Sequence, residues 1–415
     1  MYTKRFLYPS VFLFLFFSTS LFAQNSKLAV FLNCQKTRCY SDFLRTELSH
    51  FELVRDQDSA EVLVLITSNN NASGGANYLI YFEGQKSFRT QIDTLRFSVK
   101  QDATDDIIRK KLLNAISLGL LGYLNIHSDS DQVKVSFPKN SNSNTVNKID
   151  KWHNWIFGLG GNGRFSGESN RTNITLDANF RGGRTTEKSK FSFNTYFAER
   201  TNKVILDSIN NVVKVNDYGF NSLFVKSFNN HWSLGGFVKG YHSVYQNIKF
   251  SKSMAPALEY SVFPVQDFNR KQFRWIYQAG LRDFDYLETT VFEKIEETLP
   301  YQQLTGILGF TENWGNFSAE MSGYQYLNNL ERYRISLEID FSIRVASGLS
   351  IRFYGNGSQI NNQISLPKRS GDATNVLLGG RQLATTFSYS TSFGLNYTFG
   401  SVNNSIVNPR FSGVN

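Results

Sequence analysis

The stretch YRISLEIDFSIRV, residues 333–345, alternates between apolar and polar side chains over thirteen residues. Successive side chains of a β-strand point to opposite faces of a sheet, so one face of this strand is wholly apolar. A strand in a soluble sheet usually has about five or six residues, whereas about 9 to 11 tilted residues cross a bilayer. The length and the uniform face therefore predict lipid, or a very large core, against this strand. The apolar face carries Tyr333, Ile335, Leu337, Ile339, Phe341, Ile343 and Val345, and the other carries Arg334, Ser336, Glu338, Asp340, Ser342 and Arg344.

The same alternation recurs from Trp152 onward, for example in NITLDANFR (173–181) and QFRWIYQAGLR (272–282). Aromatic residues make up 15% of the chain while hydrophobic residues reach only 41%, which suits strands with an apolar residue at every second position. We count twelve strands, an even number, as a closed antiparallel barrel with both ends on one side requires. They are expected to begin near Trp155, Asn173, Lys190, Tyr218, Trp232, Met254, Gln272, Gln303, Asn316, Arg332, Leu349 and Thr385.

The connections between these strands fall into two length classes. Outer-membrane barrels have short periplasmic turns and longer external loops. If the first strand leaves the periplasm, the long connections fall outside and the short ones inside, which places the N-terminal region and the C-terminal end on the periplasmic side. A large secreted β-sandwich or β-helix protein would explain the alternation, but not the strand length and the loop asymmetry together. The long segments are 199–217, 283–302 and 359–382, and the short ones are 229–230, 312–316 and 346–348, with 182–188 and 264–271 as intermediate exceptions.

The first 23 residues, Met1 to Ala23, have the pattern of an export signal. Lys4 and Arg5 precede the apolar run 11–17, and a small residue precedes Gln24. A transmembrane helix is the alternative, but the apolar run is short and polar residues interrupt it. The net charge of +10 comes from scattered Lys and Arg residues in an exported chain. It therefore disfavours nucleic acid and favours anionic lipid headgroups or anionic solutes as partners.

Residues 24–126 have the mixed pattern of a small α/β domain. Apolar strands are expected near 27–34, 60–67 and 77–84, and a further strand near 94–99. Helices are expected over 41–51, with Ser41 as N-cap, and over 102–124. The composition of the polar, Ser/Asn-rich segment 127–150 indicates a linker. The predicted barrel then covers 151–400, and a C-terminal tail covers 401–415.

Cys34 and Cys39 are the only two cysteines. In an oxidising compartment they could close a small disulfide loop, and free thiols are the alternative. Their spacing is not that of a C-x-x-C redox motif. The sequence shows no cluster of metal-ligating residues, and we expect neither a metal nor a cofactor.

The export signal, the segments FLNC and SGGANYLIYFEGQ, the alternating strands and the ending NNSIVNPRF resemble a group of uncharacterised bacterial outer-membrane proteins with a periplasmic α/β domain. The barrel is also similar to the salt-induced outer-membrane protein family. The resemblance implies an outer-membrane location and supplies no catalytic residues. The expected fold is mainly β: an about twelve-stranded antiparallel transmembrane β-barrel preceded by a small α/β periplasmic domain. The last strand ends at Phe399, before the tail, so the barrel-assembly machinery would have to recognise an internal signal.

Charges of both signs are expected on the inward face of the barrel. They could form salt-bridge ladders that fill the lumen, or line a narrow arginine-biased pore for anionic solutes. Twelve strands lie between filled eight-stranded barrels and open porins, so the strand number does not decide between these. The expected lumen-lining residues are Arg164, Asp177, Arg181, Arg274, Arg282, Arg334, Glu338, Asp340, Arg344 and Arg352.

Two further functions stay open. A hydrolase would need a serine, a histidine and an orienting residue, and His231 with Ser233 and His242 with Ser243 are the pairs to consider. Alternatively, the barrel anchors a periplasmic domain whose polar hairpin tip, residues 68–75, docks a protein partner. The glycine-rich segment 158–163 opens no helix, so it indicates barrel packing and not a phosphate-binding loop.

Overall fold

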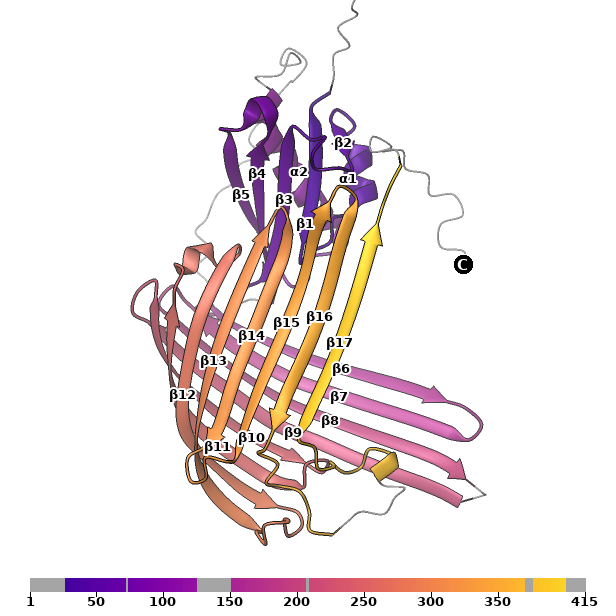
Figure 1. The fold of residues 1–415 in the computed structure, drawn as a ribbon, viewed down its shortest axis with the longest axis vertical. Helices are drawn as coiled ribbons and strands as arrows, with labels where there is room; N and C mark the ends of the chain where they lie inside the picture. The colour runs from indigo at the N-terminus through magenta and orange to yellow at the C-terminus, as the bar shows by residue number, and fades with distance from the viewer. Residues whose placement is uncertain (1–26, 72–73, 125–150, 207–208, 370–375, 401–415) are drawn as a thin grey trace, which may run out of the picture.

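A computed structural model describes residues 27–71, 74–124, 151–206, 209–369 and 376–400. The predicted signal peptide, linker and C-terminal tail lie outside these residues. The described chain forms two sheets, one of five strands in the order β2-β1-β3-β4-β5 and one of twelve strands, β6 to β17, in sequence order (Figure 1). The small sheet belongs to an α/β domain that stands against one end of the large sheet.

The α/β domain has the mixed sheet and the two helices that the sequence predicts. Strand β1 pairs in parallel with β2 and β3, while β3, β4 and β5 are antiparallel. The apolar stretch of β3 is fully buried, as are Leu112, Ile116 and Leu120 of the last helix. Ser41 is the first helical residue and not the N-cap, because Tyr40 occupies that position with a φ of 47°. The elements are β1 Ala29–Gln35, α1 Ser41–Glu47, β2 Glu52–Val54, β3 Val62–Asn70, β4 Ala76–Gly84, η1 Lys86–Phe88, β5 Ile92–Val99 and α2 Asp105–Leu124.

The large sheet is an antiparallel meander in which each strand pairs with the next along the chain. All twelve predicted strands are present, and seven of them begin within one residue of the expected position. They are β6 Trp155–Gly167, β7 Arg171–Thr185, β8 Ser189–Leu206, β9 Ile209–Ser227, β10 Trp232–Ser243, β11 Ile248–Ser261, β12 Lys271–Tyr286, β13 Glu296–Glu312, β14 Gly315–Tyr326, β15 Tyr333–Ala346, β16 Leu349–Ile360 and β17 Phe387–Tyr397.

Two of the three predicted long loops are largely strand. Segment 199–217 continues the hairpin, since β8 extends to Leu206 and β9 begins at Ile209. Its many β-branched residues favour extended backbone. Segment 283–302 likewise shortens to 287–295, because β12 and β13 continue pairing to Asp285 and Glu296. The connection after β16, residues 361–386, is the long one.

The expected closure of the barrel is not observed. In the described residues no pairing joins β6 to β17, and these two strands form the edges of the sheet. The sheet curls, so that β6 to β9 pass behind β13 to β17 at a steep angle (Figure 1). Apolar side chains at both edges are consequently exposed, with Leu159 85% and Phe393 68% accessible.

Candidate functional site

The pairing register assigns every strand residue to one of two faces of the large sheet. Directly opposed residues on neighbouring strands share a face. One continuous row of opposed residues crosses seven strands, and from it the whole sheet can be assigned. We call the face that carries this row the polar face. The row is Gly158, Arg181, Asn194, Asn221, Lys239, Ser253 and Arg282.

All ten residues predicted to line a lumen lie on the polar face. The register links Arg282 through β13 and β14 to Glu338, which opposes Glu320. It also links Arg181 through β7 and β6 to Asp177 and Arg164. The sequence therefore predicted correctly which residues share a face, although the face is not closed into a lumen here.

The opposite face, which we call the apolar face, carries exposed hydrophobic side chains on every strand except β16. Leu281 is 58% and Met321 56% accessible. Such a wide exposed apolar surface is abnormal for a soluble monomer. Its members include Phe165, Leu176, Phe180, Phe197, Phe220, Phe224, Leu234, Leu258, Trp275, Tyr277, Leu304, Leu337 and Phe393.

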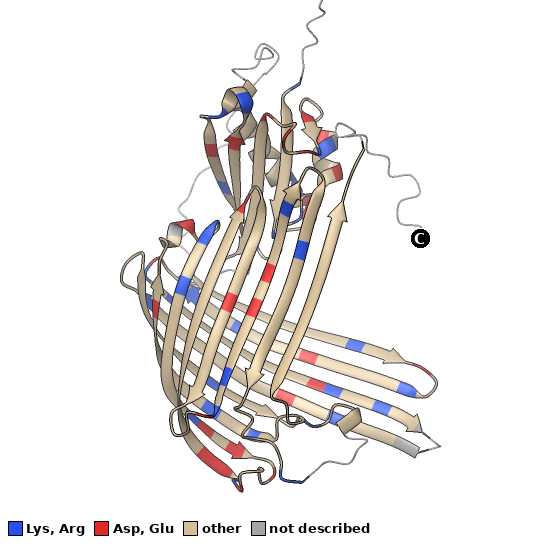
Figure 2. Ribbon diagram, in the orientation of Figure 1, with Lys and Arg blue, Asp and Glu red and all other residues tan. Residues whose placement is uncertain are grey.

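Acidic residues gather midway along β14 and β15 on the polar face (Figure 2). Glu320, which the sequence analysis did not single out, is directly opposite Glu338, and Asp340 is two residues further along. The Asn316 amide donates to Asp340 Oδ1 at 3.3 Å. The alternation of β14 could have identified Glu320, because it occupies a polar position between Ala319 and Met321.

A tyrosine-rich cluster surrounds Arg282 on the polar face. Its guanidinium carbon lies 5.6–5.9 Å from the ring centroids of Tyr241, Phe284, Tyr301 and Tyr324. At these distances the ring faces attract the cation. The cluster includes buried residues of β11 to β14 and Ile364, which belongs to the connection after β16 and is 3% accessible.

We call the end of the sheet that Ile364 covers the loop end. Here Asn247, 5% accessible, donates from Nδ2 to the backbone oxygens of Glu288 and Ser365 at 3.0 and 2.9 Å. Its Oδ1 accepts the Glu288 N–H at 2.8 Å. Arg381 forms a two-point ion pair with Glu288 at 2.6 and 3.3 Å. The connection after β16 is therefore folded over this end and held by buried groups.

The α/β domain contacts the opposite end, which we call the turn end. The Asn33 amide donates to the Asn313 backbone oxygen at 3.0 Å, and the Asn313 amide donates to Glu83 at 2.5 Å. The Arg270 guanidinium lies 4.2 Å from the ring centroid of Tyr81. These contacts join β1 and β4 of the domain to the turns before β12 and β14.

Arg344 occupies a different environment from the one predicted. The register places it on the polar face, but its side chain reaches the domain. The Arg344 guanidinium donates to Gln57 Oε1 at 3.0 Å and lies 4.3 Å from the Phe31 ring centroid. A strand-terminal position explains this, since the next residues turn beneath the docked domain.

Of the other predicted residues, Arg274 pairs with Glu259 at 3.7 Å. Arg334 donates to the hydroxyls of Ser336 and Ser358, both at 3.2 Å. The polar face thus combines a few cross-strand pairs with charges that have no carboxylate partner among the described residues.

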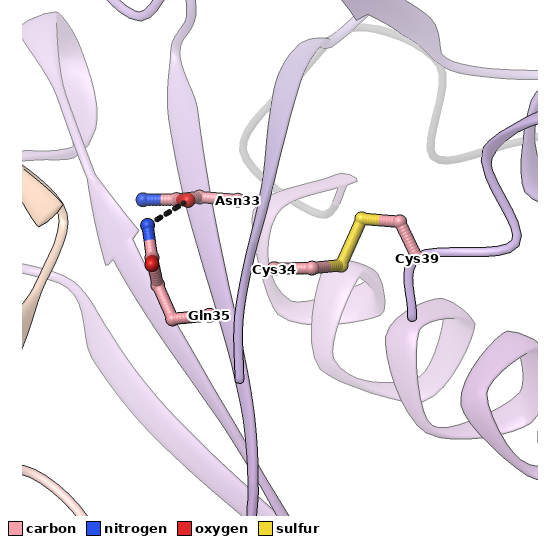
Figure 3. The surroundings of a disulfide bond; sticks show 4 residues. All are labelled: Asn33, Cys34, Gln35 and Cys39. Carbon is pink, nitrogen blue, oxygen red and sulfur yellow. Dashed lines mark hydrogen bonds between the residues drawn. A yellow bond between two sulfur atoms is a disulfide. The ribbon is translucent and has the colours of Figure 1, made fainter. Parts of the chain in front are cut away.

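The two cysteines are joined in a disulfide with a Cα–Cα distance of 5.6 Å. Cys34 lies at the end of β1 and its side chain points toward α1, while Asn33 and Gln35 point to the other side of the strand (Figure 3). Gln35 Nε2 donates to Asn33 Oδ1 at 2.9 Å. The bridge therefore fixes the strand end that presents Asn33 to the large sheet.

The histidine–serine pairs do not form a nucleophile–base arrangement in the described structure. His231 Nδ1 is 2.7 Å from the Ser261 backbone oxygen. His242 is bonded on both ring nitrogens, to the Lys249 backbone oxygen at 2.8 Å and to Asn216 Oδ1 at 3.3 Å. Both histidines therefore have structural partners, and the Asn216 contact was not foreseen from the sequence.

No group of three or more potential metal ligands occurs among the described residues. Within the same residues, no helix is long and apolar enough to span a membrane.

Comparison with protein-family models and with curated proteins returns no match. Among solved structures, the chain is similar to one described as "NanC porin structure in rhombohedral crystal form". The identity is 8% and the TM-score 0.28, and the match covers 59% of this chain and 99% of that chain. A TM-score this low does not establish a common fold.

Proposed function

We propose that the chain is an outer-membrane β-barrel protein that forms a narrow channel for small, preferentially anionic solutes. The observation that carries this proposal is the division of all twelve strands into an apolar face and a polar face, which carries charges on every strand except β17. Lipid accommodates the apolar face, and water inside a lumen solvates the charged one. The polar face carries more Arg residues than Asp and Glu residues together, and this excess of positive charge favours anions.

This proposal requires the edges β6 and β17 to pair in the membrane. An unpaired strand edge cannot be solvated within hydrocarbon, so a lipid-embedded sheet closes on itself. Both edge strands expose apolar residues at odd-numbered positions, so pairing of odd with odd positions keeps the apolar face continuous.

Closure can be tested by disulfide trapping across the edges. We would combine Leu159→Cys in turn with Tyr389→Cys, Phe393→Cys or Leu395→Cys in protein refolded into lipid. One pair is expected to cross-link within single molecules. Cross-links that form only between molecules, or not at all, would contradict a closed barrel.

Channel activity is tested by single-channel conductance in planar bilayers, with and without residues 24–150. We expect steady openings with anion preference, and a lower anion preference in Arg334→Gln. Glu338→Gln is the matched control, since removal of an acid from the same strand should raise anion preference. A folded barrel that stays silent in both forms would contradict the channel.

One observation favours a second function: both ends of the large sheet are covered. Ile364 is buried at the loop end, and the α/β domain is docked at the turn end. A barrel filled in this way would instead anchor the periplasmic domain for a protein partner. Silence in bilayers together with capture of a defined periplasmic protein by residues 24–126 would favour this second function.

A further inference from the structure

A cavity of about 610 Å³ lies between the α/β domain and the polar face of the large sheet. The domain contributes Asn70, Asn71 and Gly74, at the described part of the β3–β4 hairpin, and Gln101 after β5. The sheet contributes residues from β6 to β10. The cavity therefore has walls from both sheets, and it is of the size in which small molecules are usually bound.

The charge of this cavity has one sign. Arg181, Lys190 and Lys239 line it, and its described lining contains no Asp or Glu. None of the three cations forms an ion pair with a described carboxylate. Lys239 belongs to the opposed row with Asn221, Asn194 and Arg181, so its ammonium and the Arg181 guanidinium flank two side-chain amides. Like charges without a counter-charge repel one another, which an anion between them would relieve.

The remaining lining supplies both hydrogen-bond donors and an apolar wall. Asn194, Asn221 and Gln101 present side-chain amides. Ile156, Leu223 and Phe237, which the register places on the polar face, contribute apolar surface. Lys239 Nζ lies 5.2 Å from the Phe237 ring centroid. An ion without an apolar part would make no contact with this apolar wall, whereas a carboxylate or phosphate on an apolar body matches both the cations and the wall.

We propose that this cavity is a binding site for a small organic anion, with a carboxylate or phosphate held by Arg181, Lys190 and Lys239 and an apolar body against the wall of Ile156, Leu223 and Phe237. The inference deepens the proposed channel function, because it places the solute site where the periplasmic domain meets the polar face. The domain is then part of the site: the hairpin residue Asn70 and Gln101 complete it from the domain side.

The test is equilibrium binding of phenyl phosphate, benzoate and inorganic phosphate to the full-length protein, refolded in non-ionic detergent at low ionic strength. We expect phenyl phosphate and benzoate to bind, inorganic phosphate to bind more weakly, and neutral phenol not to bind. Lys239→Gln and Arg181→Gln should each weaken binding of phenyl phosphate about 10-fold, as expected for loss of a charge-assisted hydrogen bond of about 1.5 kcal/mol. Gln101→Ala should weaken it about threefold.

Arg164→Gln is the matched control, because it removes one positive charge from the same face outside the cavity lining. If it weakens binding as much as Lys239→Gln does, only diffuse charge attracts the anion and the site is overturned. Equal binding of phenyl phosphate to protein lacking residues 24–126 would overturn the role of the domain. Conductance without binding overturns this inference and leaves the channel intact, whereas binding without conductance supports the site and contradicts the channel.

Discussion

The two ends of the large sheet are covered in different ways. At the loop end the chain covers itself, with Ile364 buried among aromatic residues and Asn247 bonded to three backbone groups. At the turn end a separate domain with its own core is attached through polar and cation–π contacts such as those of Arg344 and Asn33.

The difference indicates which end can open. Burial of an isoleucine side chain contributes about 1.5–3 kcal/mol. The three buried hydrogen bonds of Asn247 add to this, so we expect the connection after β16 to unfold together with the large sheet. Each polar contact at the turn end contributes about 0.5–1.5 kcal/mol. We therefore expect the domain to separate from the large sheet more easily than the connection after β16 leaves the loop end.

The largest effect is expected from Asn247→Ala, which breaks the loop end. The substitution leaves two carbonyls and one N–H without their side-chain partner, and it forces alanine into a backbone with φ of 61°. We expect a loss of about 3 kcal/mol in unfolding free energy, measured as a lower midpoint for heat modification on gels. Gln246→Ala in the same turn, where the side chain is exposed, should change little. Equal effects of the two would show that Asn247 does not hold this end.

Removal of the disulfide tests whether the α/β domain and the large sheet unfold independently. The bridge closes a loop with a sequence separation of five. The chain-entropy relation gives about 2 kcal/mol for a loop this short, so Cys34→Ser with Cys39→Ser should lower domain stability by about that amount in urea titrations. The midpoint for unfolding of the large sheet should not move. Reduction of the native protein should reproduce the effect, and a shift of both midpoints would contradict two independent cores.

Arg344→Gln breaks the turn end with a smaller effect. It removes the contacts to Gln57 and Phe31, which we expect to be worth about 1 kcal/mol. The domain should then be released about fivefold faster by a protease that cuts within 127–150. Arg352→Gln, one strand away, is the control. Unchanged release would mean that other contacts hold the domain.

The smallest effect at neutral pH concerns Tyr123 in the core of the domain. Burial raises the pKa of Tyr123 to about 12, and its hydroxyl donates to the Gln91 backbone oxygen at 3.1 Å. A pKa above the unfolded value of about 10 stabilises the fold fully below pH 10, and this contribution is lost as the pH rises toward 12. In Tyr123→Phe, the unfolding free energy of the domain should therefore fall less steeply as the pH rises from about 10 to about 12. If the pH dependence of unfolding does not change, other groups cause the loss of stability at alkaline pH.

The sequence predicted the strands well because alternation is a local signal. Each of the twelve strands, and the common face of residues as distant as Arg164 and Arg352, follows from period two and register. The α/β domain was likewise predicted from local patterns, but the cap of α1 and its end at Glu47 differ from the prediction, and the short strand β2 was not predicted.

The remaining features depend on contacts between distant segments. Arg344 fits the alternation of β15, but its partners Gln57 and Phe31 belong to another domain. The cation-lined cavity also combines hairpin residues such as Asn70 with Lys239. The extension of β8 and β9 was not predicted, because polar residues such as Asn202 and Asn211 are typical of loops. In the structure, pairing along the whole hairpin supplies hydrogen bonds to their backbone groups.

The most direct test of the central claim uses the stretch from Tyr333 to Val345 itself. Single cysteines would be placed at each position in protein refolded into lipid, where the native pair is bonded and silent. A charged thiol reagent in water should label positions 334, 336, 338, 340 and 342, and a lipid-soluble quencher should reach labels at the odd positions. That period of two would establish a water-filled interior against a lipid-facing exterior. Equal water access on both faces, or no labelling at the even positions, would contradict a membrane channel.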